Sequence, residues 1–156
     1  QSVAGLLGEL VWSRLGAEQD ASFALDGQGA EFAGGGLCTG LRDLARFGLL
    51  YLNGGVWHGE RLISEDWIEF TRTPAPATAD TGNFYGGQWW LVPDGRDDVP
   101  QTAYSTAGNR GQYVIVVPDQ DLVIVRRGLD YGRQGFDRWD LAREVLKAFD
   151  RVSDDR

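Results

Sequence analysis

The sequence has 156 residues, of which 42% are hydrophobic and 24% charged, and this is the size and composition of one folded domain with its own core. The formal net charge of −8 at pH 7 would repel a phosphate backbone, so we expect no nucleic-acid partner. No apolar run approaches the roughly 20 residues of a membrane-spanning helix, so we expect no membrane partner either. A single cysteine, Cys38, and a single histidine, His58, argue against a zinc site, and we expect no metal and no other cofactor.

The first half of the chain predicts helices. Residues 3–14 look helical, and a polar, glycine-rich loop follows over 17–36. A second helix is predicted over 41–52, with Thr39 placed to cap its start and Asp43 in its first turn. The apolar stripe that predicts it consists of Leu41, Leu44, Ala45, Gly48, Leu49 and Leu52, and Asn53, Gly54 and Gly55 end it. Ser64 can cap a third, short helix, and 71–83 is predicted as a surface loop.

The second half predicts a sheet and one more helix. Strands are predicted over 88–92, 113–117 and 122–126, the last two joined by a turn-rich link of hairpin length. Asp137 and Asp140 open a last helix. Its expected buried face consists of Leu141, Ala142, Val145, Ala148 and Phe149. Helices followed by an antiparallel sheet and a terminal helix predict an α+β fold, with a helical part over about 1–75 and the sheet with its helix over about 84–150.

The sequence lacks a recognisable nucleophile. No serine lies in G-x-S-x-G or has a lysine three residues on, and the only lysine, Lys147, falls in the last predicted helix. His58 lies in a predicted turn, where we expect a solvent-exposed imidazole. The acidic pairs lie in turns or in the tail and are expected to be solvated loop charges. The Gly34–Gly36 run lacks the Walker spacing and is expected to be a structural or pocket-lining loop.

The stretch Gly108-Asn-Arg-Gly111 is more informative. Two glycines three residues apart, just before a long β run, let the backbone pass close to another group. One possibility is a strand that offers a backbone N–H to a developing oxyanion, and the other is a plain tight turn. In Trp89-Trp90, strand alternation predicts one ring in the core and one on the opposite side, where it could also stack on a ligand.

Several segments in order resemble the β-lactamase-related serine hydrolases, a family that includes class C β-lactamases, DD-peptidases, esterases and 6-aminohexanoate-dimer hydrolases. The similar segments are 15–21, Gly35-Gly-Leu-Cys-Thr-Gly-Leu-Arg-Asp-Leu-Ala-Arg-Phe-Gly48, 59–67, Tyr85-Gly-Gly-Gln-Trp-Trp90 and Ala107-Gly-Asn-Arg-Gly-Gln-Tyr-Val114. The blocks 42–48 and 107–112 are most similar to the nylon-oligomer-hydrolase and esterase branch. The resemblance implies the C-terminal portion of a β-lactamase/transpeptidase-like fold.

The resemblance also implies site residues. In this family the serine of S-x-x-K attacks an ester or amide carbonyl, and the lysine and the tyrosine of Y-x-N move the proton. A third box, K-T-G or H-x-G, borders the pocket, and it corresponds here to Thr106-Ala107-Gly108, with Thr106 in place of the basic or imidazole residue. The backbone N–H of Asn109 would then serve the oxyanion hole. Cys38, on the glycine-rich loop, and Gln112 would join the third box in lining the substrate pocket.

The other family motifs are expected upstream of this chain, which starts at Gln1 and contains no methionine. Tyr51-Leu52-Asn53 spells Y-x-N, but it follows the blocks that the real motif precedes and is interpreted as coincidence. We therefore expect a C-terminal fragment that is inert alone, held by the missing N-terminal half or by a second copy, from a parent that cleaves a small-molecule ester or amide. The alternative is a non-catalytic binding module derived from the same fold.

Overall fold

The N-terminal segment folds as a helix of mixed type beside a small hairpin. The computed structural model describes residues 2–131 and 136–154, with side chains described up to 149. Helix α1, Val3–Leu7, starts at Ser2, whose Oγ accepts the Gly5 N–H, and continues as the π-helical turn η1, Gly8–Trp12. Strand β1, Ser22–Phe23, pairs antiparallel with β2, Leu37–Cys38. The predicted helix over 3–14 is thus confirmed with a change of helix type, whereas the predicted loop over 17–36 contains a strand.

Helix α2, Leu41–Leu52, is present as predicted, but its cap is not the predicted one. Gly40 is the N-cap and makes no side-chain capping bond, so the prediction that Thr39 caps the helix is wrong. Thr39 lies one residue before the N-cap; its carbonyl accepts from Arg127, and its buried hydroxyl has no partner among the described residues. The helix ends at Asn53, and Gly54 (φ 60°) and Gly55 (φ 84°) turn the chain away as expected.

A short hairpin and two short helices connect α2 to the sheet. Strands β3, Val56–Trp57, and β4, Glu60–Arg61, flank a turn at His58, which is exposed and has φ 47°. Helix α3, Glu65–Arg72, is capped by Ser64, whose Oγ accepts the Trp67 N–H at 3.3 Å. The loop predicted over 71–83 holds the 3₁₀ turn η2, Pro76–Thr81, which interrupts it.

The sheet has four antiparallel strands in the order β5-β6-β7-β8. Strands β7, Tyr113–Val117, and β8, Leu122–Arg126, have the predicted bounds and are joined by the 3₁₀ turn η3, Pro118–Gln120. Strand β5 covers only Trp90–Leu91, because Gln88 has φ 69° and the chain turns before it can extend. Strand β6, Tyr104–Ser105, was not predicted.

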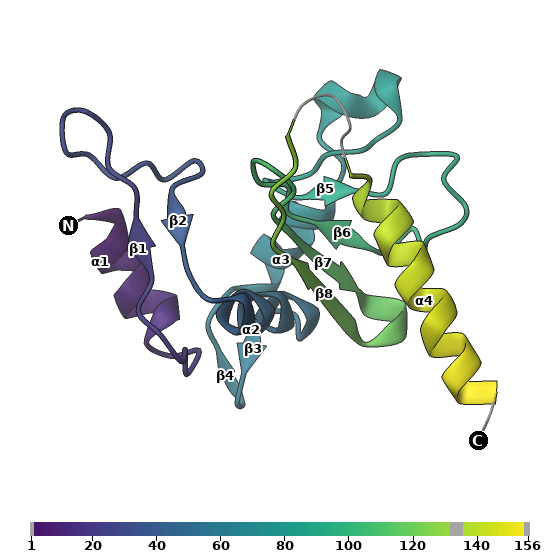
Figure 1. Ribbon diagram of the computed structural model, residues 1–156, viewed down its shortest axis with the longest axis horizontal. Helices are drawn as coiled ribbons and strands as arrows, with labels where there is room; N and C mark the ends of the chain where they lie inside the picture. Colours follow the sequence, from purple (N-terminus) through teal and green to yellow (C-terminus); the bar gives the residue numbers. More distant parts are fainter. Residues whose placement is uncertain (1, 132–135, 155–156) are drawn as a thin grey trace.

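Both faces of the sheet are covered (Figure 1). On one face, α2 and α3 enclose a core that includes Trp89, Tyr104 and Val116. On the other, α4, Arg138–Asp154, covers a core that includes Ile115, Val117 and Trp139. Trp89 is buried in the first core, whereas Trp90 lies under Arg138 of α4, so the two tryptophans face opposite sides as predicted. This arrangement confirms the α+β fold class.

The buried face of α4 agrees with the predicted one at Leu141 and Ala142, which pack in the core, and differs from it further along the helix. Trp139 and Ala142 are buried and Leu146 packs beside them, whereas Ala148 is exposed and Phe149 keeps 55% of its surface exposed. The large Trp139 ring packs on the sheet and sets which side of α4 faces it. The other residues on that side are three and seven positions later, at Ala142 and Leu146. The helix start is as predicted: Asp137 Oδ1 accepts the N–H groups of Trp139 and Asp140.

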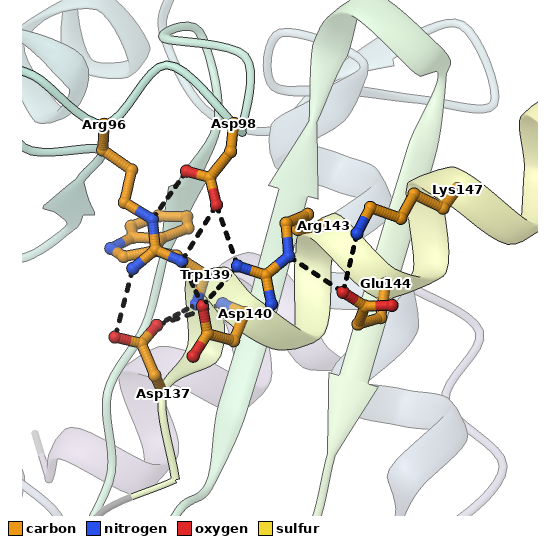
Figure 2. A network of polar contacts seen from close by, with 8 residues as sticks. All are labelled: Arg96, Asp98, Asp137, Trp139, Asp140, Arg143, Glu144 and Lys147. Carbon is orange, nitrogen blue, oxygen red and sulfur yellow. Dashed lines mark hydrogen bonds and ion pairs between the residues drawn. The ribbon is translucent and has the colours of Figure 1, made fainter.

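A network of charged side chains fastens α4 to the loop before β6 (Figure 2). Arg96 bonds to Asp98, Asp137 and Asp140. Arg143 reaches Asp98 at 3.0 Å, so one carboxylate accepts from two guanidinium groups. The hydrogen bond from Arg96, followed by that from Arg143, holds the pKa of the Asp98 carboxyl below its ordinary value.

Candidate functional site

The third-box residues form one arm of a hairpin that leads into β7. The Thr106 N–H donates to the Val114 carbonyl at 2.9 Å. The Val114 N–H donates in return to the Thr106 hydroxyl, also at 2.9 Å, so this side chain takes part in the ladder. One step closer to the turn, the Gly108 N–H donates to the Gln112 carbonyl at 2.8 Å. These bonds fix the backbone of 106–108 against β7.

Two features of the turn need glycine. A Cβ on Gly108 would lie 2.9 Å from Cβ of Gln112, which is closer than two carbon atoms pack. Arg110 (φ 62°) and Gly111 (φ 80°) both take left-handed conformations, which reverse the chain within three residues. The glycine spacing that the sequence displays therefore builds a tight turn at the end of the sheet.

Asn109 stands at the tip of this arm. The N–H groups of Thr106 and Gly108 point toward the partner arm, so strand alternation turns those of Ala107 and Asn109 to the opposite edge. Ala107, Gly108 and Asn109 are all exposed. Among the hydrogen bonds of the described residues, none uses the Asn109 N–H. Hence the hairpin presents an available backbone donor beside a rigid ladder.

Gln112 and Arg127 connect this hairpin to the end of β2, which carries Cys38. The Gln112 amide nitrogen donates to the Gly128 carbonyl at 2.5 Å, and its amide oxygen accepts from Nε of Arg127 at 3.2 Å. Nη1 of Arg127 donates to the Thr39 carbonyl at 2.6 Å. Cys38 is exposed one residue before Thr39, and its thiol lies 3.6 Å from the Gly36 carbonyl. The predicted pocket residues therefore lie on two segments, the hairpin at 106–112 and the stretch around Cys38, which Gln112 and Arg127 join.

Sequence reasoning missed Arg127 in this arrangement. The signal that could have found it is a second arginine directly after the strand 122–126, at the same end of the sheet as the third box. Its partner Thr39 is 88 residues away in the sequence, so no local pattern links them.

The structure does not assemble a catalytic pair from the described residues. Ser105 is fully buried and its hydroxyl donates to the Thr106 carbonyl at 2.6 Å. Tyr51 packs between Phe47 and Trp89 in the core, as expected for a coincidental Y-x-N. Lys147 pairs with Glu144 on α4. The described part of the chain thus offers an exposed backbone N–H at Asn109, without a nucleophile activated by a neighbouring base.

The described residues, 2–131 and 136–154, contain no cluster of three or more histidine, cysteine, aspartate or glutamate side chains that could hold a metal ion. No helix in the same residues is long and apolar enough to cross a membrane. One surface hollow lies between the 97–101 loop and α4, and another lies beside Arg72. Residues 106–112 of the hairpin line neither of them.

The decisive comparison is with protein families. The model of the family described as Beta-lactamase matches residues 8–145, which is most of the chain. The chain belongs to the beta-lactamase family. The 6-aminohexanoate-dimer hydrolase of Paenarthrobacter ureafaciens is 34% identical over 129 residues, covering 77% of this chain and 32% of that protein. This chain thus spans about a third of the curated relative that it matches.

Solved structures agree with this family and its fold. A protein from Bacillus anthracis, provisionally named a 6-aminohexanoate-dimer hydrolase, is 25% identical and superposes with a TM-score of 0.73 over 96% of this chain and 38% of its own. A beta-lactamase-like structure from Bacteroides dorei shares the fold at 21% identity, with a TM-score of 0.65 over 92% of this chain and 50% of its own. These likenesses show that the chain has the fold of these structures.

Proposed function

We propose that this chain is the C-terminal part of a serine hydrolase that cleaves ester, amide or β-lactam bonds through an acyl-enzyme, with its nucleophile and base upstream. The observation that carries the proposal is the hairpin at 106–112. It places an unoccupied N–H at Asn109 directly after the third box, where the family has an oxyanion donor. The chain alone supplies one wall of the pocket and half of the oxyanion hole, and it is inert without the rest.

In the proposed reaction, the upstream serine oxygen adds to the substrate carbonyl while the upstream base takes its proton. The carbonyl oxygen becomes an oxyanion, which accepts the Asn109 N–H and a second N–H from the nucleophile's own segment. The leaving alcohol or amine departs with the proton, which leaves an acyl-serine. Water then adds to the acyl carbon, the same N–H stabilises the second oxyanion, and the carboxylic acid and free serine are released.

The Asn109 N–H suits this task because its position is fixed before the substrate binds. A backbone N–H fixed by the Gly108–Gln112 bonds needs no reorganisation when charge develops on the substrate. Thr106 replaces the family's basic or imidazole residue, and its hydroxyl accepts the Val114 N–H. Cys38, Thr106, Ala107, Gly108 and Gln112 would line the pocket. The Paenarthrobacter relative favours a small linear amide as the substrate class.

Two substitutions at one position test the proposal in the full-length protein. Asn109→Pro removes the backbone N–H and should lower kcat by roughly 10²–10³-fold, the range for one oxyanion donor. Asn109→Ala keeps that N–H and serves as the matched control, with kcat close to wild type. Circular dichroism of both variants checks that the proline has not disrupted the hairpin. Equal, small effects on kcat would exclude Asn109 as the donor.

A further inference from the structure

A bidentate ion pair between Arg126 and Asp130 lies next to the turn that carries Asn109. Nη2 of Arg126 lies 2.7 Å from Oδ1 of Asp130, and Nη1 lies 2.9 Å from Oδ2. The Phe136 ring covers the guanidinium, with its centroid 4.0 Å from Cζ. Both charged side chains keep less than a quarter of their surface exposed. The planar pair is therefore oriented from both sides and cannot rotate freely.

This pair holds the turn by its backbone. Nη1 of Arg126 also donates to the Gly111 carbonyl at 2.9 Å. The Asp130 N–H donates to the Arg110 carbonyl at 3.2 Å. Both carbonyls of the left-handed residues in the turn are thereby bonded to the segment 126–130. The adjacent Gly128 carbonyl accepts the Gln112 amide, so the same segment holds the far arm as well.

Two glycines give the pair its space. A Cβ on Gly111 would lie 2.0 Å from Nη1 of Arg126 and 2.2 Å from Oδ2 of Asp130. A Cβ on Gly128 would lie 2.1 Å from Nη1 of Arg126 and 2.6 Å from the Arg110 carbonyl oxygen. Any other residue at either position would push the pair away from the turn. The ion pair therefore bonds to the turn, and it fits there because Gly111 and Gly128 have no side chain.

We propose that Arg126 and Asp130 are positioning residues that set the direction of the Asn109 N–H in the reaction. The inference rests on the proposed function of Asn109 and extends it to two residues that touch no substrate. Asn109 is one residue from Arg110 and two from Gly111, so a turn released from the pair would move the donor. Misplacing a catalytic group by about 1 Å can cost on the order of 10²-fold in rate. The hydrogen bond from Arg126 holds the pKa of Asp130 below its ordinary value.

Steady-state kinetics of the full-length protein with a p-nitrophenyl ester test the proposal. Asp130→Asn keeps the size of the side chain but loses the charge, and Arg126→Lys keeps a charge but cannot bond to two oxygens at once. Both should lower kcat by roughly 10–100-fold, with KM changed by less than about threefold. Asp98→Asn is the matched control, because it breaks the contact of one carboxylate with Arg96 and Arg143 (Figure 2), which involves no residue of the hairpin.

The outcomes separate this proposal from the one on which it rests. A wild-type protein without esterase or amidase activity would contradict the proposed function itself. An active wild type with Asp130→Asn and Arg126→Lys at wild-type kcat would overturn the positioning role alone. A rise in KM without a fall in kcat would also overturn it, as would an equal fall in Asp98→Asn. A fall in kcat confined to the two hairpin variants, with unchanged circular dichroism, is the expected result.

Discussion

At the residue scale, Gly48 shows how closely α2 packs on the sheet. A Cβ at this position would lie 2.6 Å from a methyl carbon of Val123 and 2.8 Å from one of Val114. Both valines belong to strands whose positions are fixed by a five-residue ladder. The helix can approach this sheet only where it has no side chain, so the glycine in the apolar stripe is a packing residue.

Gly48→Ala is therefore expected to destabilise the full-length protein despite the better helix propensity of alanine. Overpacking costs about 1–3 kcal/mol, and the propensity gain of about 1 kcal/mol offsets only part of it. Gly8→Ala is the control, since a Cβ there meets open space within 4 Å, and it should be neutral or stabilising. Urea denaturation measures both free energies of unfolding. A stabilised Gly48→Ala variant would show that α2 can move away from the sheet without cost.

Asp43 is a second residue whose role exceeds its sequence signal. It was predicted only to lie in the first turn of α2, and it is buried with 1% of its surface exposed. Its carboxylate accepts the Glu18 and Gln19 N–H groups and the Arg46 guanidinium, at 2.9, 3.3 and 2.9 Å. It therefore ties the loop after η1 to α2.

Asp43→Ala should lower the free energy of unfolding by about 1–3 kcal/mol, because it removes the carboxylate that accepts two backbone N–H groups and the Arg46 guanidinium. Asp43→Asn keeps one acceptor oxygen and should cost clearly less. Thermal unfolding of the two variants beside wild type checks the order. Equal losses would mean that the carboxylate charge, and not the number of acceptors, holds the loop.

The local part of the site was predictable from sequence, and the rest was not. Gly108 and Gly111 indicate a tight turn, because the close contact at Gly108 and the backbone angle at Gly111 favour glycine. Arg127 and the Arg126–Asp130 pair carry no such signal, because their partners are backbone atoms of a turn that lies elsewhere in the sequence. A hydrogen bond from an arginine to the Thr39 carbonyl, 88 residues away, depends on the packed fold alone.

At the element scale, the helices and strands with the strongest sequence patterns were the ones predicted most accurately. Strands β7 and β8 were predicted to the residue, since β-branched runs on both sides of a turn leave few alternatives. Strand β6, two residues long, exists only because β5 and β7 flank it. The predicted cap at Thr39 was wrong because the helix starts one residue later, with Gly40 as its N-cap. The predicted face of α4 was right at Leu141 and Ala142 but wrong at Ala148 and Phe149, which are exposed.

The network that fastens α4 predicts a specific response to acid. Arg96 and Arg143 lower the pKa of Asp98, so its contribution to stability is fully present above the unfolded-state pKa of about 3.9. The contribution is lost as the pH falls through the lower, folded-state pKa. In urea denaturation, Asp98→Asn should be less stable than wild type at pH 7, and the gap should narrow by pH 3. A gap that stays constant between these values would show that the charge of Asp98 is not what fastens α4.

At the scale of the whole molecule, the N-terminal segment is poorly covered. Large apolar side chains in it and at the start of α2 keep between 38% and 61% of their surface exposed, and they are Val3, Leu6, Leu10, Leu25, Phe32, Leu37 and Leu41. In Figure 1 this segment lies to one side of the sheet, next to α2. So much apolar surface in one region favours a partner that covers it.

We therefore expect the isolated 156-residue chain to need a partner, either the N-terminal half of its parent or a second copy. Size-exclusion chromatography with light scattering should show an oligomer or aggregate for the chain alone. Co-expression with the upstream segment should give one defined complex. A monodisperse species of about 17 kDa with a cooperative melt would show that the chain folds unaided.

The central claim is that this chain completes a serine hydrolase whose nucleophile lies upstream. The most direct measurement is mass spectrometry of the full-length protein after brief exposure to a fluorophosphonate, followed by peptide mapping of the adduct. We predict one covalent adduct on a serine outside the 156 residues, blocked by prior incubation with an ester substrate. No adduct, or an adduct on a serine of this chain such as the buried Ser105, would contradict it.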